Sequence, residues 1–76
     1  MRMEELKSGA ALVIKPLERR IDAASATGFK NTLGERIQKG EKFIILDLSE
    51  VDFIDSTGLG AIVSVLKSLG DGGELI

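Results

Sequence analysis

The sequence contains neither cysteine nor histidine, and each absence removes a class of chemistry. Without cysteine, neither disulfides nor thiolate metal sites can reinforce the small core of a 76-residue chain. Without histidine, a serine–histidine catalytic pair cannot form within the chain, and the commonest neutral metal ligand is missing. We therefore expect one small domain over residues 1–76, held together by packing, and not an enzyme.

Aromatic residues and net charge are also scarce. Only 4% of the residues are aromatic and the formal net charge is −2, whereas nucleic-acid readers need stacking platforms or a basic surface. No apolar run reaches the roughly 18 residues that would span a membrane. The first residues, Met1 to Glu5, lack the apolar centre of a signal peptide. We therefore expect no direct contact with nucleic acid, no membrane segment and a cytoplasmic location.

The first half of the chain predicts two short strands followed by a helix. The strands lie within residues 3–16, and Ser8-Gly9 is the expected two-residue hairpin turn between them. Helical periodicity covers residues 22–39, and Asp22 is a suitable N-cap. The apolar stripe of this helix consists of Ala26, Phe29, Leu33 and Ile37.

A continuous apolar run, Phe43 to Leu46, lies within a third predicted strand over residues 42–48. Continuous rather than alternating apolar residues are typical of a strand that is covered on both faces in a parallel or mixed sheet. A helix on each side of this strand in the sequence agrees with parallel crossover connections. Glu74 to Ile76 then looks like the start of another strand. The pattern therefore predicts an α/β fold.

The residues from Asp55 to Gly60 lie where a strand passes into a second helix, predicted from about Thr57 to Leu69. Backbone N–H groups are unpaired at such a junction, and a hydroxyl there can be exposed. The spacing favours Ser56 as an N-cap serine, whereas the functional alternative is a phosphorylation or partner-contact site. The two readings are compatible if Asp55 caps the helix and leaves the Ser56 hydroxyl free.

The second predicted helix has two different faces. The apolar positions are expected to face the sheet; they are Leu59, Ile62, Val63, Leu66 and Leu69. Small residues continue the line of Ser56 at four-residue intervals, with Lys67 beside them; they are Gly60, Ser64 and Ser68. A stripe of small side chains lets another backbone approach closely, so we expect a docking face there.

The same region permits two other kinds of site. Asp47, Asp52 and Asp55 could hold a hard cation such as Mg²⁺, although aspartates at strand ends commonly cap turns and helices. Gly58 and Gly60 could cradle a phosphate, but their spacing matches neither the Walker pattern nor G-x-G-x-x-G. Close packing is the commoner role of such glycines. We therefore expect neither a metal nor a cofactor.

Taken together, these residues resemble the STAS domain of the bacterial anti-sigma factor antagonists. The stretch from Phe43 to Ile62, F-I-I-L-D-L-S-E-V-D-F-I-D-S-T-G-L-G-A-I, is similar to the family's buried strand, Asp-Leu-Ser turn and Asp-Ser-(Ser/Thr)-Gly helix start. Arg20 to Ala26, R-I-D-A-A-S-A, is similar to the entry into its first helix. The resemblance covers nearly the whole chain. It implies a mixed β-sheet with helices packed on one face.

Relatives in this family usually continue with another strand and a terminal helix, which are missing after Ile76. An incomplete sheet exposes an edge and part of the core. We therefore expect that the chain is a C-terminally truncated fragment, or that it forms a homodimer or exchanges elements with a second copy through its incomplete C-terminus.

The resemblance also implies a switch. In such antagonists, the serine directly after the motif's aspartate, here Ser56, is phosphorylated by an anti-sigma factor that is itself a serine kinase. The unphosphorylated antagonist binds this kinase and frees the sigma factor, and a phosphatase reverses the modification. The expected partner-contact residues are Asp55, Ser56, Thr57, Gly58, Gly60 and Ser64.

Two other functions stay open at this point. One is a STAS module of another assembly, such as a stress-signalling scaffold or the cytoplasmic part of a transporter. The other is a small nucleotide-binding or hydrolysing protein, against which the missing phosphate loop and histidine argue. Steady ATP turnover that is abolished by Asp55→Asn would favour this last alternative.

Overall fold

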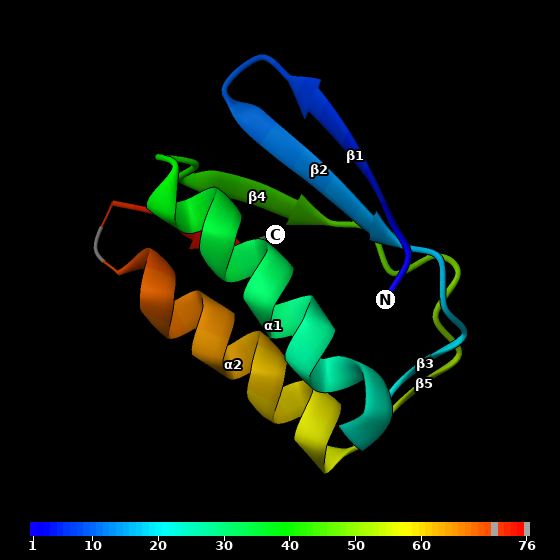
Figure 1. Cartoon of the computed structure of the whole chain (residues 1–76). Coiled ribbons are helices and arrows are strands. Elements are labelled where there is room, and N and C mark those ends of the chain that lie inside the picture. Colours follow the sequence, from blue (N-terminus) through cyan, green and yellow to red (C-terminus); the bar gives the residue numbers. More distant parts are fainter. Residues whose placement is uncertain (71, 76) are drawn as a thin grey trace.

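The computed structural model describes residues 1–70 and 72–75. Its elements are β1 (Met3–Ser8), β2 (Ala11–Pro16), β3 (Arg20–Ile21), α1 (Ala23–Gln38), β4 (Phe43–Leu46), β5 (Phe53–Ile54), α2 (Ser56–Leu69) and β6 (Glu74–Leu75). A four-stranded sheet with the order β1-β2-β4-β6 is covered on one face by two helices (Figure 1). β1 is antiparallel to β2, whereas β4 is parallel to both of its neighbours, β2 and β6, so the sheet is mixed. The predicted α/β fold with helices on one face is therefore confirmed.

The hairpin turn between β1 and β2 lies one residue later than predicted. Ser8 still pairs with Ala11 in the antiparallel ladder, which leaves Gly9 and Ala10 as the turn. Gly9 has a φ of 60°, in the left-handed region that glycine adopts at little cost. Of the strand expected at Glu74 to Ile76, β6 confirms the first two residues, and Ile76 lies outside the described residues.

Local side-chain hydrogen bonds set the start of α1. The Asp22 side chain accepts a hydrogen bond from the Ala24 N–H at 3.1 Å, and the Ser25 hydroxyl accepts one from the Asp22 N–H at 3.0 Å. These contacts form a capping box, which satisfies donors that have no partner within the helix. The predicted start of this helix and its N-cap are confirmed.

One hydrophobic core lies between the sheet and the helices. Its buried side chains come from the inner face of the sheet, from β3 and from both helices: Leu12, Ile14, Ile21, Ala26, Phe29, Leu33, Ile44, Ala61 and Val65. Phe29 is the largest side chain that is fully buried. Because a short chain buries a small share of its surface, each of these side chains matters for stability.

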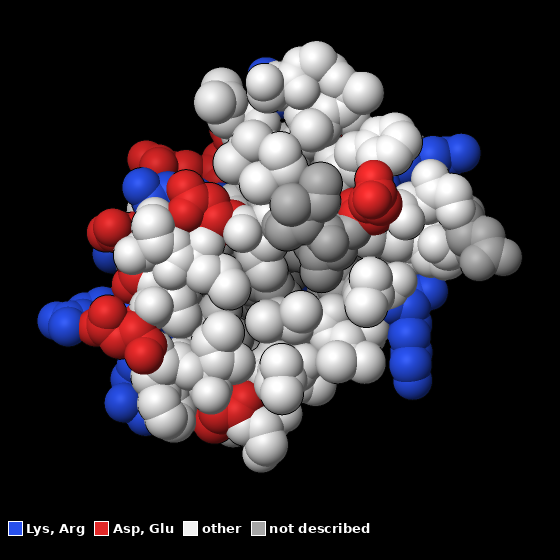
Figure 2. All heavy atoms as spheres, turned by 180° about the vertical axis from the view of Figure 1, so that it is seen from behind, with Lys and Arg blue, Asp and Glu red and all other residues white. Residues whose placement is uncertain are grey.

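The outer face of the sheet is not covered by either helix. Ile44 of β4 is fully buried on the inner face, whereas the adjacent Phe43 points the other way and is 38% exposed. Side chains alternate along a strand, so a strand with helices on one side only buries every second residue. The expectation that this strand is covered on both faces is therefore wrong. Figure 2 shows the side away from the helices, with mostly uncharged side chains over its middle.

The face of α2 that packs against the core also differs from the prediction. Its buried residues are Gly58, Ala61 and Val65, and Ile62 and Leu69 are partly buried against the core. Three residues that were expected to face the sheet, Leu59, Val63 and Leu66, are 57%, 42% and 51% exposed. Small residues allow α2 to approach the rest of the fold closely. This close approach turns part of the apolar stripe of the helix toward solvent. Within residues 1–70 and 72–75, neither helix is long and apolar enough to cross a membrane.

Candidate functional site

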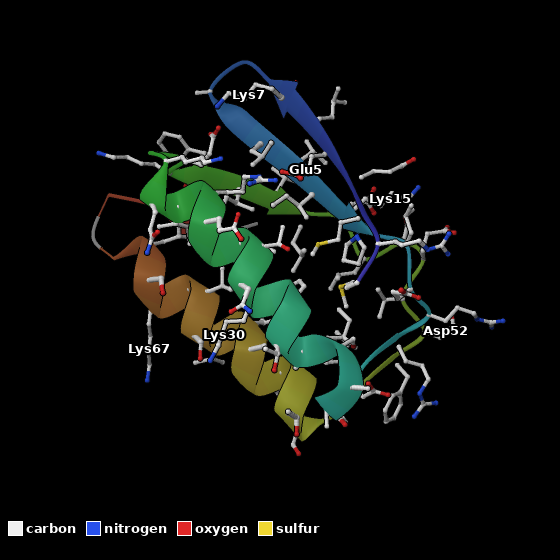
Figure 3. All side chains as sticks on the ribbon, in the orientation of Figure 1. Glu5, Lys7, Lys15, Lys30, Asp52 and Lys67 are labelled. Atoms are coloured by element: carbon white, nitrogen blue, oxygen red, sulfur yellow. The ribbon has the colours of Figure 1, made fainter. Side chains whose placement is uncertain are left out.

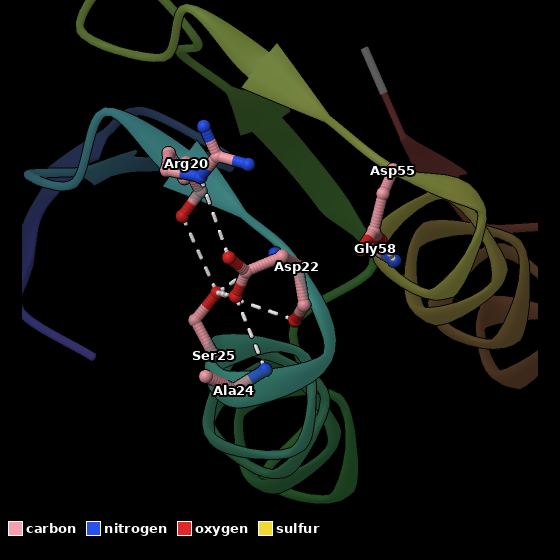
Figure 4. A network of polar contacts seen from close by, with 6 residues as sticks. All are labelled: Arg20, Asp22, Ala24, Ser25, Asp55 and Gly58. Atoms are coloured by element: carbon pink, nitrogen blue, oxygen red, sulfur yellow. Dashed lines mark hydrogen bonds and ion pairs between the residues drawn. The ribbon is translucent and has the colours of Figure 1, made fainter.

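Two short parallel strands hold the start of both helices in place. β3 pairs with β5, and each strand is followed at once by an aspartate that caps a helix. Asp22 caps α1 and Asp55 caps α2 (Figure 4). The two helices therefore begin at the same end of the molecule (Figure 1). Sequence patterns did not predict this pairing, because two-residue strands are too short to show a periodicity.

Asp55, and not Ser56, is the N-cap of α2. Its Oδ1 accepts a hydrogen bond from the Gly58 N–H at 2.8 Å, an interaction that is worth about 1 kcal/mol. Ser56 is the first residue of the helix, and its side chain is exposed. The interpretation of Ser56 as the cap is therefore wrong. The arrangement in which Asp55 caps the helix and leaves the Ser56 hydroxyl free is the one observed.

Gly58 is required where α2 begins against the backbone of β3. The Ile21 carbonyl accepts a hydrogen bond from the Asp55 N–H at 3.2 Å. A Cβ atom on Gly58 would lie 2.9 Å from the carbonyl carbon of Ile21 and closer still to its oxygen. A Cβ atom on Gly60 would meet nothing within 4 Å. Close packing is thus confirmed for Gly58, whereas Gly60 lies beside open space.

Part of the predicted small-residue stripe faces a groove between the helices. The groove has a volume of about 380 Å³, and its lining includes Thr27 and Lys30 of α1 and Thr57, Gly60 and Ser64 of α2. Three of the predicted partner-contact residues therefore meet at one surface. The remaining residue of the stripe, Ser68, does not line the groove, and its hydroxyl donates a hydrogen bond to the Ser64 carbonyl at 3.0 Å.

An exposed aromatic side chain also lies beside the stretch from Asp55 to Gly60, and no sequence pattern predicts a function for it. Phe53 of β5 is 43% exposed. The guanidinium carbon of Arg20 lies 4.3 Å from the centroid of its ring, a cation–π contact worth about 0.5–1 kcal/mol at an exposed site. Arg20 also forms an ion pair with Asp22 at 3.5 Å. Arg20 therefore links Phe53, just before the start of α2, to Asp22, at the start of α1.

The three aspartates that could have formed a cation site have separate roles. Asp47 accepts a hydrogen bond from the Ser49 N–H at 2.9 Å, and hydrogen bonding from Ser49 lowers its pKa below the ordinary value. Asp52 pairs with Arg19 through its carboxylate, and Asp55 caps α2. The part of the chain that the structure describes contains no group of three His, Cys, Asp or Glu side chains that could hold a metal ion.

The chain matches the family model described as STAS domain over residues 4–76. It therefore belongs to the STAS domain family. Over 66 residues it is 33% identical to BtrV of Bordetella bronchiseptica, which carries the provisional name of anti-sigma factor antagonist. This match covers 86% of the chain and 57% of BtrV. The chain thus spans less than two thirds of the length of this relative.

Solved structures of anti-sigma factor antagonists share the fold. One from Mycobacterium paratuberculosis has a TM-score of 0.86 at 20% identity, over 97% of this chain and 62% of that protein. Bacillus SpoIIAA in its phosphorylated form has a TM-score of 0.76 at 19% identity, over 99% of this chain and 69% of SpoIIAA. These structures share the predicted fold, and the predicted membership of the STAS domain family is confirmed by the family model.

Proposed function

We propose that this STAS domain binds an anti-sigma factor serine kinase while Ser56 is unmodified, and that phosphorylation of Ser56 ends this binding. Residues 1–76 act as one domain, which works by binding a partner and not by catalysis. Binding of the kinase frees the sigma factor, and a phosphatase that acts on Ser56 completes the cycle. The exposed Ser56 hydroxyl, directly after the capping Asp55, is the observation that carries the proposal.

The charge of a phosphate group is sufficient for such a switch. Phosphorylation adds about −1.5 to −2 charges at neutral pH. The start of α2 favours a negative charge, whereas the Asp55 carboxylate next to it repels one. At an interface, the phosphate would also have to lose water against a surface that fits a neutral hydroxyl. A loss of about 1.4 kcal/mol weakens binding tenfold, so no refolding is required.

The remaining contact residues have different parts in this proposal. Thr57 and Gly60 are exposed beside Ser56, and Ser64 is half-buried in the same groove, so all three can touch a partner. Gly58 is buried against Ile21 and acts by placing the helix start. Two observations on relatives support the proposal. BtrV is named for the antagonist role, and SpoIIAA is described in both phosphorylated and unphosphorylated forms.

The test is incubation of the protein with ATP and the candidate kinase, followed by intact mass and peptide mapping. One phosphate on Ser56 is expected. Ser56→Ala should keep kinase binding, and Ser56→Asp should weaken it about tenfold or more. Ser8→Asp, which adds the same charge to an exposed serine at the end of β1, serves as the control and should bind like the unchanged protein.

Two results would count against the proposal. One is phosphate on another residue, or none on Ser56. The other is equal kinase binding by Ser56→Ala and Ser56→Asp. Ser64→Arg tests the extension of the contact along α2, since a long side chain that fills the groove should leave the partner no room there and weaken kinase binding.

A further inference from the structure

We propose that the groove between α1 and α2 receives an acidic side chain of the kinase, and that Lys30 is the residue that selects it. This inference rests on the proposed function, because its partner is the kinase that modifies Ser56. It identifies a second contact surface, outside the phosphorylation site, and the charge that the kinase must carry where it meets this surface.

The groove is open and its walls are short. Ala26 and Ala61 are buried at its base, and Gly60 has no neighbour within 4 Å of the position that a Cβ would take. The volume of about 380 Å³ is large enough for a side chain to enter between the helices. Thr27 and Ser64 add hydroxyl groups from opposite walls. The groove therefore offers hydrogen-bonding groups around an unfilled space.

Lys30 supplies the charge of this groove. It is the single charged residue in the groove's described lining. None of the ion pairs found among residues 1–70 and 72–75 includes it. Its neighbours one turn away on α1 are uncharged; they are Ala26, Thr27, Leu33 and Gly34. Figure 3 shows its side chain between the two helices, whereas Lys67 points away from them.

A carboxylate is the group that fits such a groove. A charge-assisted hydrogen bond from an ammonium group is stronger than a neutral one, and hydroxyls on both walls can donate to the second oxygen. An exposed pair is worth little in water. The same pair gains strength when a partner covers the groove and excludes water. Lys30 therefore discriminates between partners that do and do not carry an acidic side chain at this point.

The position of the groove commits the proposal to the kinase. Thr57 lines the groove and directly follows Ser56 in the first turn of α2. A kinase that places the Ser56 hydroxyl in its active site must cover this turn, and hence the adjacent end of the groove. One partner can therefore contact both places at once.

The test measures kinase affinity by titration calorimetry for three variants of Lys30 or its surroundings. Lys30→Glu should weaken binding about tenfold, and Lys30→Arg should keep it, because the cation is preserved. Gly60→Leu should also weaken binding, because its side chain would occupy the open space beside Gly60, where an added Cβ meets nothing within 4 Å. Lys42→Glu is the charge-matched control: Lys42 is exposed just before β4, outside the groove, and its reversal should leave affinity within about twofold.

Salt dependence gives a second readout. Added salt should weaken binding of the unchanged protein more than binding of Lys30→Glu, because the variant has lost the attractive pair. Thermal unfolding of the Lys30 and Lys42 variants, followed by circular dichroism, should match that of the unchanged protein, and Gly60→Leu should unfold at no lower temperature, because leucine favours the helix more than glycine does. This measurement separates loss of a contact from loss of the fold.

The outcomes distinguish this inference from the proposed function. If Lys30→Glu binds the kinase like the unchanged protein while Ser56→Asp does not, the groove is not the contact and the phosphorylation switch stands. If the unchanged protein neither binds the kinase nor gains phosphate on Ser56, both proposals are wrong. If sedimentation velocity shows a homodimer that Lys30→Glu alone abolishes, a second copy is the occupant and the inference is overturned.

Discussion

Gly58 of α2 lies against the carbonyl group of Ile21 in β3, and this contact sets how the helix lies on the rest of the fold. The same carbonyl accepts a hydrogen bond from the Asp55 N–H. One contact brings the first turn of the helix close to β3, and the other holds the residue that caps it. Together they leave the intervening Ser56 exposed at the end of the molecule.

Alanine at two glycines of α2 should have opposite effects. Gly58→Ala should lower the free energy of unfolding by about 1–3 kcal/mol, because the added Cβ has no room beside the Ile21 backbone. Gly60→Ala should raise it by about 0.5–1 kcal/mol, since alanine favours the helix and meets nothing there. Urea denaturation measures both changes. Equal stabilities would show that the close approach at Gly58 does not hold the helix.

Substitutions of Asp55 and of Ser56 should have different effects on the free energy of unfolding. Asp55→Ala should cost about 1 kcal/mol, because the Gly58 N–H loses its acceptor. Asp55→Asn should keep most of the stabilisation by the cap, since an amide oxygen can accept the same hydrogen bond. Ser56→Ala should change stability by less than about 0.5 kcal/mol. A loss at Ser56→Ala as large as at Asp55→Ala would mean that the serine does cap the helix.

An ion pair between the sheet and α1 should make stability depend on pH. Arg36 donates hydrogen bonds from Nε and Nη2 to the two carboxylate oxygens of Glu5, the second at 2.8 Å. Hydrogen bonding from Arg36 lowers the pKa of Glu5 below its ordinary value of 4.5. The folded state therefore holds the ionised form more firmly than the unfolded chain does. This contribution is present above pH 4.5 and is lost as the pH falls through the lower folded pKa.

Glu5→Gln tests this contribution. The difference in unfolding free energy between the unchanged protein and Glu5→Gln should be larger near neutral pH than well below the ordinary pKa. Chemical denaturation across this pH range gives the comparison. Glu4→Gln, a change at the adjacent residue of β1 that has no ion pair in the described part of the chain, is the control. A difference that does not change with pH would rule out this role of the pair.

Two apolar side chains next to each other on α2 should respond very differently to truncation. Val65 is 1% exposed and Leu66 is 51% exposed. Val65→Ala should cost about 2 kcal/mol, because it removes buried methyl groups and leaves a cavity. Leu66→Gln should change stability by less than about 0.5 kcal/mol. Thermal unfolding measures both changes. A large loss of stability in Leu66→Gln would support the buried helix face that sequence periodicity predicted.

Most of the local structure could be predicted from the sequence. The start and N-cap of α1, its buried stripe through Phe29 and Leu33, and the apolar strand β4 all depend on residues that are close in the chain. The mixed sheet and the family followed from the motif between Phe43 and Ile62. Short-range hydrogen bonds and hydrophobic periodicity carry this information, so a pattern of neighbouring residues is enough to read it.

The wrong prediction about the buried face of α2 depends on segments that are distant in the chain. Periodicity identified an apolar stripe on α2, but the approach of Gly58 to Ile21 decided which part of this stripe is buried. The helix is rotated about its axis so that it makes the closest contact with the rest of the fold. Small residues allow this contact, whereas the largest apolar residues of the helix do not. Sequence patterns do not show which backbone will lie opposite a helix.

By itself, the sequence determined that the chain has an α/β fold of the STAS family, which the family model matches over residues 4–76, and that Ser56 directly follows an aspartate at a helix start. Only the tertiary structure decided that Asp55 makes the cap, that the Ser56 hydroxyl is left exposed, and that Lys30 faces the groove beside it. The physical reason is that Asp55 and Ser56, side by side, could each have capped the helix through local contacts. The exposure of a hydroxyl and the shape of a groove depend instead on how β3, α1 and α2 pack together, which no local pattern contains.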